Sequence, residues 1–135
     1  MARPFIVGRV EMSRLAADLV RAGRLEAEMG RVHREVANRV ASLSRAKAVG
    51  LGGVHRHVSP GIMAVGPAIG LDVGAQPAIL GAEFGGGARP RTRQFPPWRG
   101  SGDRAGYMVY PTIREMRDEI DRAYEGMIDD TVGNR

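Results

Sequence analysis

The sequence contains no cysteine, and this absence excludes disulfide bonds, thiolate metal sites and cysteine nucleophiles. No apolar run approaches the ~20 residues that a membrane-spanning helix needs, so we expect no contact with a membrane. The N-terminal segment MARPFIVGRVEMSRL lacks the sustained apolar stretch of a signal peptide, because Arg9 and Glu11 interrupt it. We therefore expect a soluble protein that is made in the cytoplasm.

Recognisable catalytic motifs are also missing. The glycine-rich stretch GAEFGGGAR lacks the Lys-Ser/Thr pair that completes a phosphate loop. The carboxylates gather near the C-terminus among arginines, which is typical of a solvated, ion-paired helix face. His55 and His57 flank Arg56, but no carboxylate lies within 14 residues of this pair on either side. Since a metal site needs three or four converging ligands, we expect solvated loop histidines, no metal, no cofactor, no catalytic residue and no enzyme activity.

Lysine is nearly absent, because 19 of the 20 basic residues are arginine, and the charge changes sign along the chain. Residues 1–60 carry 11 basic and five acidic groups, and residues 61–85 carry only two acids. Residues 86–114 then hold six arginines against one aspartate, whereas 115–135 hold seven acids against three arginines. This alternation suits a self-associating protein about as well as a nucleic-acid-binding one.

The hydrophobic pattern predicts a single α+β domain with one long N-terminal helix. Between residues 12 and 48 the apolar positions recur in steps of three or four, the spacing of one helix face. Gly23 and Gly30 interrupt this pattern and mark a kink, a close helix–helix approach or a break into two helices. The stripe consists of Met12, Leu15, Leu19, Ala22, Leu25, Met29, Val32, Val36, Val40 and Leu43.

Beyond the long helix the period changes, and short apolar runs alternate with Gly and Pro. This pattern predicts a small antiparallel sheet, with strands at 61–66, 68–74 and 78–84. Pro111–Ile128 is predicted to form a C-terminal helix that buries one stripe, made of Ile113, Met116, Ile120, Tyr124 and Met127. The predicted order is an N-terminal strand or arm (1–11), the long helix (12–48), the sheet (54–84), an ordered docking loop (85–106), the C-terminal helix with its hinge (107–128) and a tail (129–135).

Few aromatic residues are present, yet several gather in and just after the docking loop, with the only Trp at position 98. Aromatics interleaved with arginines are expected where bases stack and phosphates are bound, so a small basic nucleic-acid-binding protein using residues 89–110 is one hypothesis. The same residue types anchor protein–protein contacts, and Pro96-Pro97 would stiffen a docking loop. Trp98 would then either meet a partner or fold back on the sheet of its own chain.

Three segments together resemble the head-to-tail connector, or neck, proteins of long-tailed actinobacterial phages: GAEFGG (81–86), RQFPPWRG (93–100) and GYMVYPTIRE (106–115). FIVGRVEMSRLAADL, near the N-terminus, resembles the strand and Leu-rich helix that begin the wider tail-completion family. Glu83-Phe84-Gly85 matches the Glu-Phe-Gly element that closes the sheet in that family, and the resemblance implies a C-terminal helix that packs on the sheet. PAILGA stands where family members carry an aromatic-containing segment, so an aromatic contact expected there is absent.

The resemblance implies a structural virion protein without enzyme activity, which forms a homo-oligomeric ring of six or twelve copies in the phage neck. Such a ring joins the head to the tail, contacts portal-side, neck and tail-tube proteins, and lets genome DNA pass without sequence-specific binding. The tail-completion type is our choice among adaptor, stopper, joining protein and tail terminator. The predicted interface residues are Glu83, Phe84, Gly85, Arg93, Phe95, Trp98, Arg99, Tyr107, Tyr110 and Arg114.

Overall fold

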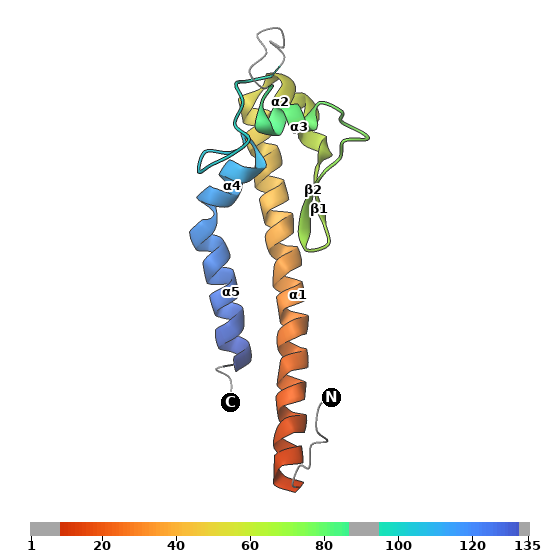
Figure 1. Ribbon diagram of the computed structural model, residues 1–135, viewed down its shortest axis with the longest axis vertical. Coiled ribbons are helices and arrows are strands. Elements are labelled where there is room, and N and C mark those ends of the chain that lie inside the picture. Colours follow the sequence, from red (N-terminus) through yellow and green to blue (C-terminus); the bar gives the residue numbers. More distant parts are fainter. Residues whose placement is uncertain (1–8, 87–94, 133–135) are drawn as a thin grey trace, which may run out of the picture.

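The computed structural model describes residues 9–86 and 95–132, and they form an elongated α+β fold built on one long helix. This helix, α1 (Arg9–Leu51), runs the length of the molecule, with a β-hairpin on one side and the C-terminal helix α5 (Arg117–Val132) on the other (Figure 1). Short helices and the loop that follows residue 94 gather at the end where α1 finishes. No helix in the described ranges is both long and apolar enough to cross a membrane.

Helix α1 is longer than the predicted 12–48 and is unbroken. It continues through Gly23 and Gly30, and a Cβ added at Gly23 would meet nothing within 4 Å, so this glycine marks no close approach. The helix ends before Gly52, whose φ of 71° is costly for any residue with a side chain. Of the predicted N-terminal strand or arm, residues 1–8 lie outside the described ranges, and Arg9 and Val10 already belong to the helix.

The predicted sheet is confirmed only as a two-stranded hairpin. Strand β1 (Ile62–Val65) pairs antiparallel with β2 (Ala68–Leu71), and Ile62 lies opposite Leu71. A short helix, α2 (Gly53–Val58), and a 3₁₀ turn, η1 (Ser59–Gly61), connect α1 to the hairpin. The second strand ends earlier than predicted because the Asp72 carboxylate accepts the Ala75 N–H at 3.0 Å and closes a turn.

The third predicted strand, at 78–84, is wrong, because Ile79–Phe84 forms the helix α3. The three residues that α3 buries, Ile79, Ala82 and Glu83, are spaced three and four apart, as on one face of a helix. Leu80, between them, is exposed. A six-residue apolar run is too short for its period to separate a strand from a helix, and the buried carboxylate at position 83 was not foreseen.

The predicted C-terminal helix divides into α4 (Val109–Glu115) and α5, with the break at Met116. Pro111 lies in the first turn of α4, as predicted. Met116 and Met127 are buried and Ile120 and Tyr124 half-buried, whereas Ile113, predicted for the same stripe, is exposed. The main partner of this segment is α1 rather than the sheet, because the hairpin occupies the other side of α1 (Figure 1).

The hydrophobic core lies where the C-terminal half of α1 meets the short elements. It contains Val40, Ala41, Ala48, Val58, Ile62, Ile79, Ala82, Met108, Val109 and Met116. Polar contacts also connect α1 to the C-terminal segment. Lys47, beside the core, pairs with Glu115 at 2.7 Å, and nearer the N-terminus of α1 His33 bonds the Tyr124 hydroxyl. The N-terminal part of α1 extends past the end of α5 and exposes Leu19.

Candidate interaction surface

The centre of the candidate surface is a buried carboxylate. Glu83, on the last turn of α3, is fully buried, and its two oxygens accept the backbone N–H groups of Met108, Val109 and Tyr110 at 3.0–3.1 Å. These are the groups at the start of α4 that have no partner within their own helix. The next residue is Pro111, which has no N–H to satisfy. Glu83 therefore caps α4 completely from a distant part of the sequence, and its negative charge faces the positive end of the helix.

Two glycines make room for this contact. Gly106 has a φ of 80°, and a Cβ at this position would collide with Glu83 Oε1. Gly85 has a φ of 92°, and a Cβ there would collide with the Pro97 carbonyl. Both positions favour glycine for two reasons: φ is positive, and a neighbouring oxygen leaves no room for a Cβ. The glycines at 85 and 106 therefore let α3, the loop and α4 approach one another.

Hydrogen bonds fix the described part of the docking loop, residues 95–106, against α3. Arg99 N–H donates to the Phe84 carbonyl at 2.6 Å, and Gly86 N–H donates to the Pro96 carbonyl at 3.0 Å. Gly106 N–H closes the loop on the Arg99 carbonyl at 2.7 Å. The segment Glu83-Phe84-Gly85 thus contacts α4 through the Glu83 carboxylate and the loop through the Phe84 carbonyl, so it forms the base of the loop.

Three aromatic side chains form a cluster over this joint, here called the aromatic patch: the half-buried Phe84 and the exposed Trp98 and Tyr110. The Phe84 ring centroid lies 6.4 Å from that of Trp98 and 5.6 Å from that of Tyr110. The indole of Trp98 covers Gly100, where a Cβ would overlap the ring. Even so, Trp98 is 59% exposed and Tyr110 46% exposed. Trp98 therefore packs on its own loop and on α3 rather than on the hairpin, and most of its surface stays free.

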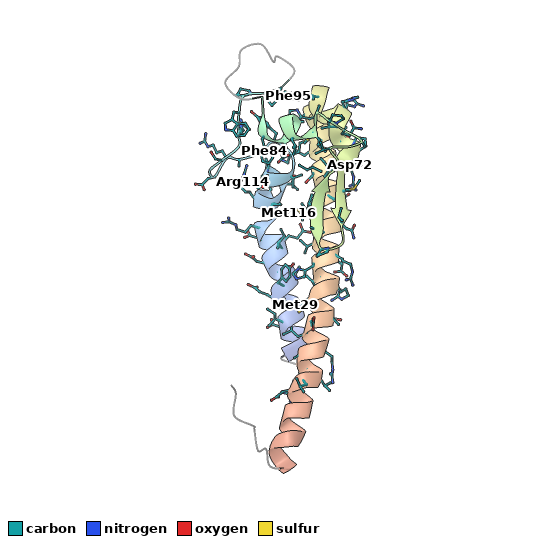
Figure 2. All side chains as sticks on the ribbon, turned by 45° about the vertical axis from the view of Figure 1, so that its right-hand side comes forward. Met29, Asp72, Phe84, Phe95, Arg114 and Met116 are labelled. Carbon is teal, nitrogen blue, oxygen red and sulfur yellow. The ribbon has the colours of Figure 1, made fainter. Side chains whose placement is uncertain are left out.

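The other predicted aromatic residues contribute to contacts within the chain. The Phe95 ring packs on Gly81, at the outer side of α3 (Figure 2). Tyr107 is half-buried, lies 5.4 Å from the His55 ring and donates its hydroxyl to the Pro97 carbonyl at 2.6 Å. These two aromatics hold the loop in place and are not part of the aromatic patch.

Two of the three predicted arginines make contacts that hold the loop. The Arg99 guanidinium lies 4.3 Å from the centre of the Tyr107 ring, a cation–π contact. Arg114 donates to the Ala105 carbonyl at 2.7 Å. Arg93 lies outside the described residues. Arg99 remains exposed, so the surface beside the aromatic patch is positively charged.

The expectation of solvated loop histidines is wrong for His55. This residue lies in α2, is 8% exposed and packs beside Tyr107. Its Nε2 has no hydrogen-bond partner among the described residues. His33 is half-buried and bonds Tyr124, whereas His57 is exposed as expected. Within the described residues no three or more His, Asp or Glu side chains converge as metal ligands would.

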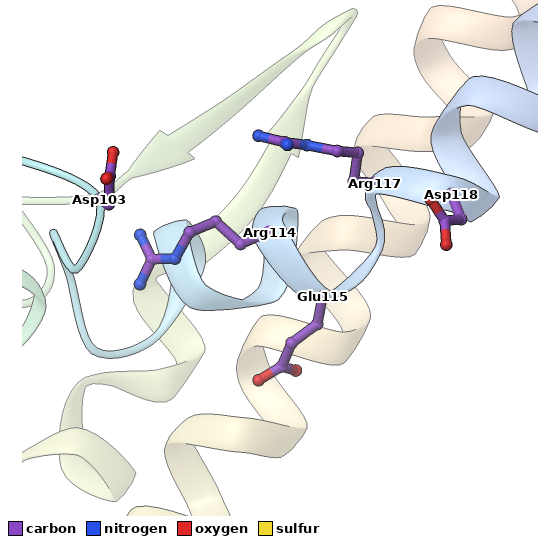
Figure 3. Close-up of a pocket in the computed structure, with 5 residues that line it drawn as sticks. All are labelled: Asp103, Arg114, Glu115, Arg117 and Asp118. Atoms are coloured by element: carbon purple, nitrogen blue, oxygen red, sulfur yellow. The ribbon is translucent and has the colours of Figure 1, made fainter.

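An open groove of about 490 Å³ lies beside the loop, between its tip and the junction of α4 with α5. It is lined by Asp103, Arg114, Glu115, Arg117 and Asp118 (Figure 3). The acids and arginines alternate around it, so no single sign of charge dominates. Glu115 pairs with Lys47, and Arg114 is bonded to Ala105. This arrangement resembles a polar rim of the surface more than a site with a nucleophile and its base.

Sequence reasoning missed the role of Glu83 as a cap and the exposure of Ile113, which extends the apolar surface beyond Tyr110. The spacing of glycines at 100, 102 and 106 was a usable sign of a tightly folded loop. Comparison of the chain with protein-family models, with curated proteins and with solved structures finds no match.

Proposed function

We propose that this chain is a structural virion protein that forms a ring in the neck of a long-tailed phage and joins the DNA-filled head to the tail. Within that role we propose the tail-completion type. The supporting observation is that the three segments that resemble neck proteins meet at one joint. Glu83, in segment 81–86, caps helix α4, which begins within segment 106–115. Segment 93–100 is hydrogen-bonded to Phe84 through its backbone. The resemblance thus concerns one structural unit rather than three scattered motifs.

The aromatic patch supports a role in assembly. Trp and Tyr bury a large area at a small cost in side-chain entropy, and they are enriched at the centres of protein interfaces. Here Trp98 is held by a loop with several backbone hydrogen bonds and Tyr110 by helix α4, so little further ordering is needed when a partner docks. A folded monomer gains little from leaving Trp98 59% exposed. The partners are other copies of the chain in a ring of six or twelve, with portal-side and tail-tube proteins above and below.

Substitution of Trp98 by Ala tests this function in the phage or prophage that encodes the chain. Because Trp98 is exposed, we expect the variant to keep the wild-type circular dichroism and to lose less than about 1 kcal/mol of unfolding free energy. Electron microscopy of lysates should show separate heads and tails. Val65→Ala is a matched control, since Val65 is 55% exposed at the tip of the hairpin. Normal virions from the Trp98 variant would contradict the proposal.

The second candidate is a small basic nucleic-acid-binding protein, favoured by the exposure of Trp98 and Arg104 on one loop. Stacking and phosphate contact would give strong affinity for free DNA that falls steeply with salt. A neck ring that lets DNA pass needs only weak, sequence-independent contact. Filter binding with single-stranded and double-stranded DNA separates the two functions. Tight, salt-sensitive binding by the monomer would favour the second, and no binding at low salt would remove it.

A further inference from the structure

The aromatic patch lies within a positively charged part of the chain. Residues 95–114 carry three arginines and one aspartate. Arg99 follows Trp98 directly and is bonded through its backbone to Phe84. Arg104 is exposed two residues before Gly106, which packs against Tyr110. The patch is therefore an apolar centre with cations at its rim, and it selects for a partner with an apolar centre and an acidic rim.

The end of α5 has that composition. Ile128 is 47% exposed, although it follows the buried Met127. Asp121, Glu125 and Asp129 are spaced four residues apart on the same side of the helix, and all three are exposed. None of the three forms an ion pair within the described ranges, whereas Glu115 and Glu119 nearer the start of the segment pair with α1. The free end of α5 is thus apolar and acidic, here called the acidic end.

The acidic end is unfavourable for an isolated helix. Like charges four residues apart repel each other, and Asp129 and Asp130 lie at the negative end of the helix dipole. No basic residue lies in the last turn to offset them. A cationic partner would remove both penalties at once, so the placement of these acids indicates a docking site rather than a contribution to the stability of the monomer.

The two surfaces cannot meet within one chain. From Arg117 to Asp129 the helix advances 12 residues, about 18 Å at 1.5 Å per residue. Helix α5 runs away from the loop along α1, so the acidic end lies far from the loop end of the molecule (Figure 1). Since both surfaces are on every copy, a second copy supplies each with its partner. A contact between two different patches is the kind that closes into a ring.

We propose that the acidic end of α5 of one copy docks on the aromatic patch of the next copy, head to tail. Ile128 then covers the patch, and the carboxylates of Glu125 and Asp129 face Arg99 and Arg104 of the neighbour. The inference rests on the proposed function, because it names the subunit contact of that ring. Its physical basis is the charge and apolar complementarity of two surfaces that one chain cannot bring together.

Charge reversal in two separate chains tests this contact. The patch variant carries Arg99→Glu and Arg104→Glu, and the end variant carries Asp121→Lys, Glu125→Lys and Asp129→Lys. In each variant both surfaces have the same sign, so neither should assemble alone. In an equimolar mixture every contact between unlike chains is complementary again, and alternating assemblies should form.

Sedimentation velocity of the purified full-length chain at low salt gives the result, with circular dichroism as the check on folding. We expect the wild type to assemble, each variant to be monomeric and the mixture to recover the wild-type size. If Arg99→Glu disturbs the loop through Tyr107, the variant with Arg104→Glu alone still weakens assembly. As a control, Arg24→Glu with Arg56→Glu makes the same charge change as the patch variant at exposed residues of α1 and α2 that belong to neither surface, and it should assemble as the wild type does.

A wild type that stays monomeric at the highest attainable concentration would overturn the inference, as would variants that assemble alone or folded variants whose mixture stays monomeric. These outcomes are separate from failure of the proposed function. If the chain assembles by this contact but is missing from virions, the contact stands and the neck function falls. If it is found in the neck but reversal has no effect, the function stands and this contact is wrong.

Discussion

Replacement of Glu83 by Gln tests how the fold positions the aromatic patch. The change keeps the size of the side chain but removes the charge and turns one acceptor oxygen into an N–H donor. Both oxygens of Glu83 accept backbone N–H groups of α4 at 3.0–3.1 Å in a site closed to solvent. The amide group of Gln would face a backbone donor with a donor of its own, so at least one N–H of the helix start would lose its partner.

The expected loss follows from the parts of this contact. A hydrogen bond to a charged group contributes about 1.5–3 kcal/mol, and a negative charge at a helix start adds about 0.3–1 kcal/mol or more when it is buried. Relief from burying an ion offsets part of this loss. We therefore expect Glu83→Gln to lower the free energy of unfolding by about 2 kcal/mol. Glu83→Ala should cost more, about 3–4 kcal/mol, since all the bonds are lost and a cavity remains.

Urea denaturation followed by two probes measures this loss. Circular dichroism follows the helices, and Trp98, the only Trp in the chain, reports on the loop through its fluorescence. Glu115→Gln is a matched control, because Glu115 is exposed and its ion pair with Lys47 contributes at most about 1 kcal/mol. A loss below about 0.5 kcal/mol for Glu83→Gln, or no larger than that of the control, would refute the capping role.

Two further changes test neighbouring parts of the same joint. Gly85→Ala should lower the free energy of unfolding by more than about 2 kcal/mol, because φ is 92° and the new methyl group would collide with the Pro97 carbonyl. Gly102→Ala should cost only about 1 kcal/mol, because φ of Gly102 is similar to that of Gly85 but a Cβ at Gly102 would meet nothing within 4 Å. Equal losses for the two variants would show that the collision with Pro97 does not contribute. Ile79→Ala should cost about 3 kcal/mol and exposed Leu80→Ala less than about 1 kcal/mol in the same urea titrations. The reverse order would contradict the orientation of α3.

The long helix could be predicted because its pattern repeats over many turns, and repetition makes the period unambiguous. The hairpin followed from short apolar runs on either side of Gly66-Pro67, a turn signal. Helix α3 was mistaken for a strand because six residues contain less than two helical turns. In addition, a charged side chain is normally expected at the surface, so the hydrophobic pattern gave no sign that Glu83 is buried.

The candidate site was predictable in composition but not in geometry. The aromatic and arginine residues of the loop and of the helix that follows it already singled out Trp98 and Tyr110. Which of them face solvent depends on contacts between distant segments, such as Phe95 on Gly81 and Tyr107 beside His55. The cap on α4 joins residues at least 25 positions apart and leaves no local signal, since Met108 at the cap position has no side-chain acceptor of its own.

Locating the chain in purified virions decides whether it forms a ring in the phage neck. Antibodies against the chain, seen by electron microscopy with gold label, would show where it lies. For a neck protein we expect label at the junction between head and tail, and we expect mass spectrometry to detect the chain in the purified particles. Label on the capsid shell or along the tail, or complete absence of the chain from the particles, would contradict it.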